Sequence, residues 1–135
     1  MEKTIPTRDQ IPQEDTWATD SIFASQDEWA KAFEEVVGNL STLRAFQGSL
    51  ANGPERLLEW FQSSEKIIEK AMHVILYARL NSSVDSTNEE LTGYADQAMG
   101  LYTRMLGATS FDEPEIMGIG EATINEWMET EPGLK

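Results

Sequence analysis

The chain has 135 residues, no cysteine and a single histidine, and its 24 acidic residues outnumber 10 basic ones for a net charge of −14. This length suits one domain with its own core, and the lack of cysteine excludes disulfides, thiolate metal ligands and thiol nucleophiles. The negative charge disfavours nucleic acid and anionic membranes as partners, and no apolar run approaches the ~20 residues that cross a bilayer. Since the N-terminus also lacks the apolar segment of a secretory signal, we expect a cytoplasmic location.

The N-terminal residues 1–22 are predicted to form an extended arm. Pro6 and Pro12 interrupt any helical periodicity in this part of the chain. Its apolar side chains are too many for a free tail, because burying one of them contributes about 1.5–3 kcal/mol. We therefore expect the arm to pack in a groove on the helices that follow. The side chains concerned are Ile5, Ile11, Trp17, Ile22 and Phe23.

Residues 23–135 are predicted to form one helical domain, whose first helix opens after Ser25. Ser25 and Glu28 have the spacing of a capping box, in which each side chain binds an N–H of the first turn. The apolar residues that follow recur every three or four positions, the period of one helix face, and the helix is expected to end between Arg44 and Gly48. These residues are Trp29, Phe33, Val36, Val37, Leu40 and Leu43.

The longest predicted helix runs from Gly53 to Leu80, would be roughly 38 Å long and is expected to fade at residues 81–83. Pro54 suits its first position, where a missing N–H costs nothing. Because additional apolar residues widen its apolar stripe, the helix is expected to have neighbours on more than one side. One face carries Leu57, Phe61, Ser64, Ile68, Ala71 and Ile75, and the additional residues are Leu58, Trp60, Ile67, Met72, Leu76 and Leu80.

A third helix is predicted to start at a second capping box, formed by Thr87 and Glu90, and to continue to about position 110. Three glycines lie seven residues apart within it. They either permit close approach of a neighbouring helix or mark a bend, and close approach is the preferred interpretation. The glycines are Gly93, Gly100 and Gly107.

The predicted fold is all-α, because no strand-like alternation occurs and short connections join the three main helices. We expect an antiparallel, up-down-up bundle with an extended N-terminal arm and two short C-terminal helices, over residues 113–118 and 121–129. The last residues, Pro132 to Lys135, close no element, so the chain looks cut there rather than finished.

The residue patterns that carry catalysis are missing. A zinc site needs about three protein ligands, whereas His73, the one histidine, lies one helical turn after Glu69 on the polar side of the long helix. No serine lies in a Gly-x-Ser-x-Gly turn, and no glycine-rich phosphate loop follows a strand. We therefore expect no catalytic residue, no metal ligand and no bound cofactor in this chain.

Tyr77 and Arg79 are the two candidates for substrate binding. They flank the apolar face near the end of the long helix, where polar and aromatic groups could meet a ligand. Packing in the core is the alternative interpretation of both side chains, and the sequence pattern favours it.

Several short motifs follow one another in a fixed order along nearly the whole chain. They are Arg8, Ile11-Pro12, Trp17 and Ile22-Phe23 of the arm, then Trp29, Phe46-Gln-Gly-Ser-Leu50, Tyr77-Ala-Arg-Leu80, Asp85-Ser-Thr-Asn88 and Ser110-Phe-Asp-Glu-Pro-Glu-Ile116. In this order they resemble the N-terminal region of the oligoendopeptidase F family of zinc metallopeptidases. One departure is Ala18-Thr19 after Trp17, where the family tends to have Asp-Leu.

The resemblance implies a parent protein of several hundred residues, largely helical and folded as a bowl around a deep cleft that admits short peptides. In that family a His-Glu-x-x-His helix and a further glutamate bind zinc, and the Glu within the motif activates the metal-bound water. None of that motif occurs in this chain. The resemblance therefore implies a non-catalytic N-terminal helical domain that helps to form and close the cleft, with zinc bound by the rest of the parent.

The partner implied by the resemblance is the catalytic remainder of the peptidase, and an apolar patch is expected where that part docks. Two other functions stay open. One is a free-standing helical interaction module whose acidic surface binds a basic partner, and the other is an enzyme acting alone through Tyr77, His73 and surface carboxylates. A reading frame that continues past Lys135 to a His-Glu-x-x-His motif favours the peptidase domain, and a stop codon favours the module.

Overall fold

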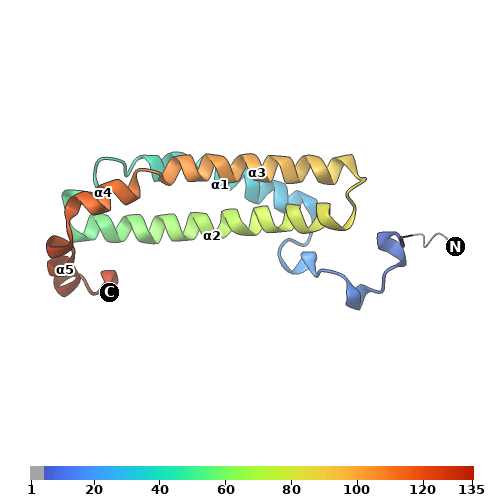
Figure 1. The fold of residues 1–135 in the computed structure, drawn as a ribbon, viewed down its shortest axis with the longest axis horizontal. Coiled ribbons are helices and arrows are strands. Elements are labelled where there is room, and N and C mark those ends of the chain that lie inside the picture. The colour runs from blue at the N-terminus through green and yellow to red at the C-terminus, as the bar shows by residue number, and fades with distance from the viewer. Residues whose placement is uncertain (1–4) are drawn as a thin grey trace.

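The computed structural model describes residues 5–135, so the first four residues of the predicted arm lie outside the described part. Within it, five α-helices and several short 3₁₀ turns follow one another, and no β-strand occurs in residues 5–135 (Figure 1). The helices are α1 (Gln26–Arg44), α2 (Pro54–Val84), α3 (Glu89–Thr109), α4 (Asp112–Ile119) and α5 (Glu121–Thr130). The prediction of an all-α fold with short C-terminal helices is confirmed.

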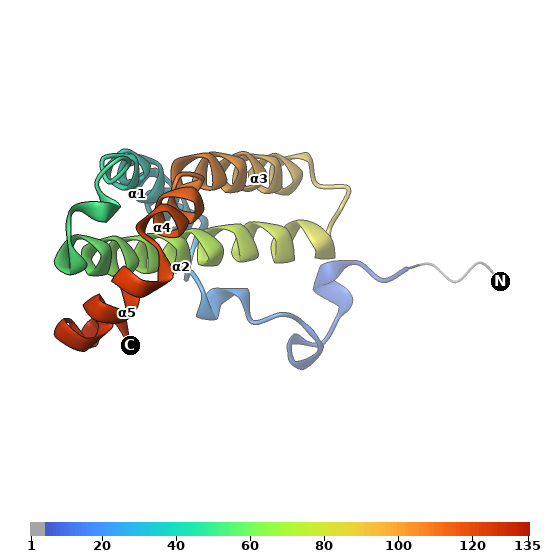
Figure 2. The ribbon, with the colours of Figure 1, turned by 60° about the vertical axis from the view of Figure 1, so that its left-hand side comes forward.

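The three long helices form an antiparallel bundle in which each contacts the other two, and Figure 2 shows α1 and α3 on the same side of α2. This confirms the predicted three-helix arrangement. The Nε1–H of Trp29 in α1 donates a hydrogen bond of 2.8 Å to the carbonyl oxygen of Val74 in α2, so the buried indole keeps its polar partner. The largest fully buried side chains are Trp29, Trp60, Leu43, Leu50, Leu57, Leu101, Val36 and Val74.

The two predicted capping boxes have different outcomes. At α1, the Ser25 hydroxyl accepts from the N–H of Glu28 as predicted, but the Glu28 carboxylate accepts from the N–H of Ala24, one residue before the cap, so only the Ser25 half of the box forms. At α3, the prediction that Thr87 caps the helix is wrong, because the side chain of Asn88 accepts from the first-turn N–H groups. The hydroxyl of Thr87 instead donates to Asp85. A short amide placed next to the first turn thus takes the position expected for the hydroxyl.

The helix α2 begins at Pro54, as predicted, and contains 31 residues. It continues four residues beyond the predicted end at Leu80, through a polar segment that sequence alone assigns to a connection. The side-chain amide of Asn81 donates to the carbonyl of Tyr77, and the hydroxyl of Ser83 donates to the carbonyl of Leu80. These bonds to the preceding turn allow the polar residues to remain helical.

The three glycines of α3 do not contact a neighbouring helix. A methyl group built on Gly93, Gly100 or Gly107 would meet no atom of a neighbouring helix within 4 Å. The prediction that they permit close helix–helix approach is therefore wrong, because the buried residues of α3 lie on another face. Those buried residues are Ala98, Leu101, Met105 and Ala108.

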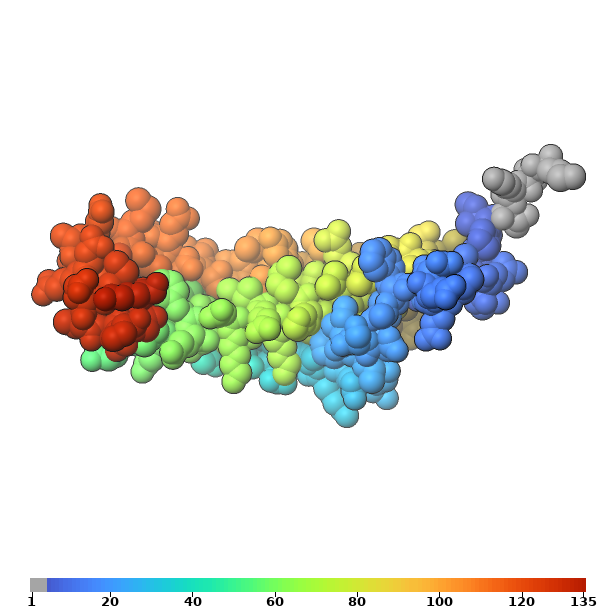
Figure 3. Space-filling model, turned by 90° about the horizontal axis from the view of Figure 1, so that it is seen from below, coloured from blue at the N-terminus to red at the C-terminus, as the bar shows by residue number. Residues whose placement is uncertain are grey.

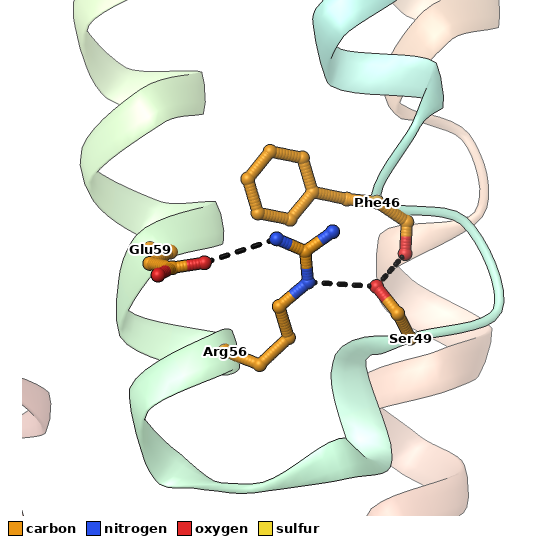
Figure 4. Close-up of polar contacts among 4 residues, drawn as sticks. All are labelled: Phe46, Ser49, Arg56 and Glu59. Carbon is orange, nitrogen blue, oxygen red and sulfur yellow. Dashed lines mark hydrogen bonds and ion pairs between the residues drawn. The ribbon is translucent and has the colours of Figure 1, made fainter.

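The turn from α1 into α2 is closed by a cluster around Arg56 (Figure 4). The Nε–H of Arg56 donates to the hydroxyl of Ser49 at 2.9 Å, and its Nη1–H donates to Glu59 at 3.0 Å. The guanidinium carbon also lies 3.9 Å from the ring centroid of Phe46. A cation over an aromatic face is attracted to it, so one side chain joins the turn to the first two turns of α2.

The helix α4 also contacts the turn between α1 and α2. The carboxylate of Glu115 accepts from the backbone N–H of Gly48 at 2.5 Å and from the N–H of Leu50 at 3.3 Å. The ring of Trp60 in α2 lies 4.8 Å from the ring of Phe111, which immediately precedes α4. Together these contacts join α1, α2 and α4 at the N-terminal end of α2.

The last part of the arm packs against the helices, and residues 5–8 line a shallow hollow beside the C-terminal end of α2. Figure 3 shows it crossing the C-terminal half of α2, while α4 and α5 lie at the opposite end of the molecule. The ring of Phe23 lies 5.5 Å from the ring of Tyr77, edge to face, and the hydroxyl of Thr19 donates to Asn81. In contrast, Ile5 and Trp17 are 87% and 60% exposed. Of the side chains expected to pack, Ile22 and Phe23 lie against the core, whereas Ile5 and Trp17 do not.

Candidate functional site

Tyr77, the first predicted substrate-binding residue, is a packed side chain. It is buried, with its ring against Phe23 of the arm. Burial raises the pKa of the Tyr77 phenol, and a hydrogen bond with the side chain of Asn81 opposes that shift. This position favours the core-packing interpretation, because the ring joins the arm to α2 and leaves little surface for a ligand.

Arg79, the second candidate, is exposed and lies on a different side of α2. Two positions along an α-helix correspond to about 200° of rotation, so Arg79 points away from the arm that covers Tyr77. Its guanidinium forms no ion pair and no side-chain hydrogen bond within residues 5–135. The structure therefore separates the two candidates instead of bringing them together.

The single histidine is likewise not part of a site in the described residues. His73 is exposed on α2, and no ion pair joins it to Glu69 in the described part of the chain. Among residues 5–135, no three His, Asp or Glu side chains lie close enough together to hold a metal ion. The same residues contain no helix that is both long and apolar enough to cross a membrane.

Two neighbouring hollows meet at Arg79. One follows α2, has a volume of ≈ 400 Å³ and is lined by side chains that include Met72, Leu76 and Ser83. The other lies between α2 and α3, has a volume of ≈ 360 Å³ and is lined by Arg79, Ser83 and Met99 among others. The hollows share Arg79 and Ser83, so they form one depression that runs from α2 across to α3.

Three large apolar side chains, Met72, Leu76 and Met99, line this depression, and three more lie further along the same two helices. All six are between 36% and 50% exposed, unusually open for residues of this size. We call this surface, together with Arg79, the α2–α3 face. Its members are Phe61, Met72, Leu76, Arg79, Met99, Tyr102 and Leu106.

Sequence reasoning found part of the α2–α3 face and missed the rest. The wide apolar stripe of α2, which includes Met72 and Leu76, predicts more than one neighbour, yet residues 5–135 leave both side chains about half exposed. Phe61 was expected on the core face of the long helix, and it is 43% exposed. The missing signal is the number of neighbours, because helical periodicity identifies an apolar face but not what covers it.

These features define the class: an all-α region whose described residues hold no metal-ligand cluster and leave one apolar face open. Comparison with known proteins then shows which proteins contain a homologous region. Over 97% of its length the chain is homologous to the N-terminal fifth of proteins of the oligoendopeptidase F, or PepF, family. This is the family that the order of motifs resembles, and the prediction is confirmed.

The relatives are named peptidases from bacteria. The chain is 31% identical over 131 residues to oligopeptidase PepF of Bacillus subtilis, covering 97% of this chain and 20% of that protein. It is 27% identical over 133 residues to the chromosomal oligoendopeptidase F of Lactococcus lactis subsp. cremoris, covering 97% and 22%. It is 23% identical over 128 residues to group B oligopeptidase PepB of Streptococcus agalactiae, covering 95% and 21%.

The chain spans about a fifth of the length of the curated relatives it matches. No family model matches the chain, and no solved structure matches it. The homology therefore concerns one region of these peptidases, and that region is the all-α bundle described above.

Proposed function

We propose that this chain is the non-catalytic N-terminal helical domain of an oligoendopeptidase F-like zinc metallopeptidase that hydrolyses short peptides. In this proposal residues 1–22 form an arm and residues 23–135 form the helical domain that helps to form and close the substrate cleft. The remainder of the peptidase supplies the zinc ligands and the catalytic groups. We propose a cytoplasmic location for the whole protein.

One observation carries the proposal: the homology extends over 97% of the chain and ends within the first fifth of relatives that are named oligopeptidases. The composition agrees with this role, because one histidine and no cysteine cannot supply the usual set of zinc ligands. The open α2–α3 face agrees as well, since a large apolar patch is typical of a surface that another protein region covers.

A chimeric enzyme tests the proposal. The matching N-terminal region of Bacillus subtilis PepF is replaced by this chain, and cleavage of a short fluorogenic peptide is measured. We expect the chimera to be active. PepF without its N-terminal region should be slower by at least about tenfold, because an incomplete cleft no longer positions the peptide.

The isolated 135-residue chain is the second arm of the same experiment. We expect it to cleave no peptide, with or without added zinc. Cleavage by the isolated chain would contradict a non-catalytic role. A chimera no faster than PepF without its N-terminal region would contradict a role in the cleft.

The net charge of −14 favours a second candidate function, a free-standing helical module that binds a basic partner. The reading frame distinguishes the two functions. If it continues past Lys135 to a His-Glu-x-x-His motif, the peptidase domain is supported, and if it stops there, the module is supported.

A further inference from the structure

We infer that the α2–α3 face is the surface on which the remainder of the peptidase docks, with Arg79 providing its polar contact to a carboxylate or carbonyl oxygen. This inference rests on the proposed function, and it adds which of the surfaces of the bundle is the interface and what chemistry the partner presents. The argument starts from the positions of the exposed apolar side chains.

The apolar members of the face lie on one side of each helix. On α2, Phe61, Met72 and Leu76 are spaced by 11 and 4 residues, and on α3 Met99 and Leu106 are spaced by 7. At about 100° of rotation per residue, these spacings return each side chain to nearly the same direction. The hollow lined by both Arg79 and Met99 connects the two helices, so Met72, Leu76 and Met99 belong to one surface. Phe61 and Leu106 extend the same side of each helix toward the N-terminal end of α2.

No described element covers this surface. The helix α1 packs against the residues of α2 and α3 that form the core, and α5 contacts α2 near its beginning. The arm reaches α2 through Tyr77 and Asn81, which point away from Arg79. As a result, Met72, Leu76 and Met99 stay 45%, 46% and 45% exposed.

The charges favour the peptidase remainder over a second copy of this chain. Two chains that each carry a net charge of −14 repel one another, and a two-fold contact at this face would bring like guanidinium groups together. Relatives about five times longer than the chain contain the additional polypeptide needed to cover the face. That part should be apolar, with an acidic or carbonyl group opposite Arg79.

Arg79 makes the contact specific. Asp96 lines the same hollow but forms no ion pair with Arg79 in the described residues. A guanidinium that becomes enclosed among methionine and leucine side chains requires an acceptor, because an unpaired charge is costly to remove from water. The partner surface must therefore offer an oxygen atom at this point.

The methionines already present in this chain provide a test that needs no substitution within it. The chimera with Bacillus subtilis PepF is treated with dilute hydrogen peroxide, and sulfoxide formation at each methionine is followed by peptide mass spectrometry. Buried Met105 is the slow reference, and Met117, which is 74% exposed on α4, is the fast reference. We expect Met72 and Met99 to react at least about tenfold more slowly than Met117, since oxidation follows exposure.

Rates at Met72 and Met99 close to that of Met117 would overturn the inference. Equal protection of both residues in the isolated chain, with a sedimentation coefficient of a dimer, would also overturn it, because a second copy would then cover the face. An active chimera with reactive Met72 and Met99 would refute the docking surface and leave the proposed function supported. An inactive chimera in which both methionines are protected would support the docking surface and contradict the proposed function.

The substitution Arg79→Gln tests the polar contact. We expect it to raise the oxidation rate of Met72 and Met99 in the chimera several-fold, as the interface opens more often. The matched control is Arg104→Gln on α3, an exposed arginine outside the α2–α3 face, which should leave both rates unchanged. If Arg79→Gln has no more effect than Arg104→Gln, the assigned role of Arg79 is wrong.

Discussion

The two ends of α2 are held by different kinds of contact. At the N-terminal end, Trp60, Arg56 and Glu115 join α2 to α4 and to the turn after α1 through tilted aromatic contacts and paired polar groups. At the C-terminal end, the contacts come from the arm, through Phe23 and Thr19. One end is thus enclosed by α4 and the turn after α1, and the other depends on the arm, whose Ile5 and Trp17 side chains remain exposed.

The largest expected effect is at the enclosed end. Trp60 is 1% exposed, and its ring lies 5.6 Å from Phe46 and 4.8 Å from Phe111. We expect Trp60→Ala to lower the free energy of unfolding by about 3–5 kcal/mol, measured by urea unfolding with circular dichroism. The matched control is Phe61→Ala, which is 43% exposed and should cost about 1 kcal/mol or less. Equal losses from the two substitutions would remove the distinction between the faces.

The next effect concerns the carboxylate that binds the turn after α1. Glu115→Ala leaves the N–H groups of Gly48 and Leu50 without their acceptor, and we expect a loss of about 1–3 kcal/mol in the same assay. Glu113→Ala removes an equal charge from the same helix at an exposed position and should change stability by less than about 0.5 kcal/mol. An equal loss in both variants would indicate a general charge effect and would not support a specific role for the hydrogen bonds of Glu115.

Substitutions at the C-terminal end of α2 should lower the free energy of unfolding by smaller amounts. Phe23 is partly buried against the core, so Phe23→Ala is expected to lower stability by about 1–2 kcal/mol. Trp17→Ala removes a larger ring that is 60% exposed and should change stability by less than about 0.5 kcal/mol. The comparison is sharpened because the bigger side chain is expected to matter less. A larger loss from Trp17→Ala would show that the arm packs through its earlier residues.

The smallest effect is a pH dependence at the same end. Burial raises the pKa of Tyr77 above its ordinary value of 10.0, so the folded protein retains this proton at a pH where the unfolded chain has lost it. Stability is therefore complete below about pH 10 and falls as the pH rises further. We expect Tyr77→Phe to reduce this fall in alkaline urea unfolding.

A second tyrosine limits the size of that reduction. The hydrogen bond from Tyr94 to Glu90 raises the pKa of Tyr94 as well. Some alkaline loss of stability should therefore remain in Tyr77→Phe. An unchanged slope in this variant would mean that Tyr77 does not titrate differently in the folded protein.

Much of the fold could be predicted from local signals. Pro54 marks the start of α2, Ser25 caps α1, and periodic apolar residues such as Trp29 and Leu40 identify the buried face. These predictions succeed because they depend on the backbone within one or two turns. The cap of α3 was missed because Thr87 and Asn88 are both good capping residues, and the geometry of the turn decides between them.

The candidate site could be predicted only in part. Arg79 was found as a candidate residue, but its separation from Tyr77 depends on where the arm lies, and no periodic pattern records that. The exposure of Met99 and Leu106 depends on how many elements surround α3. Such contacts join residues far apart in the chain, and the hydrophobic pattern is the same for a face that is covered and for one that is open.

The hydrogen bond from Trp29 to the Val74 carbonyl has a consequence for the axial alignment of α1 and α2. Apolar ridges repeat along a helix, so a slide by one turn, about 5.4 Å, preserves much of the apolar packing between α1 and α2. The indole N–H loses its acceptor in such a slide, while it stays buried in a medium without water. The bond therefore selects one axial register from several that shape alone would permit.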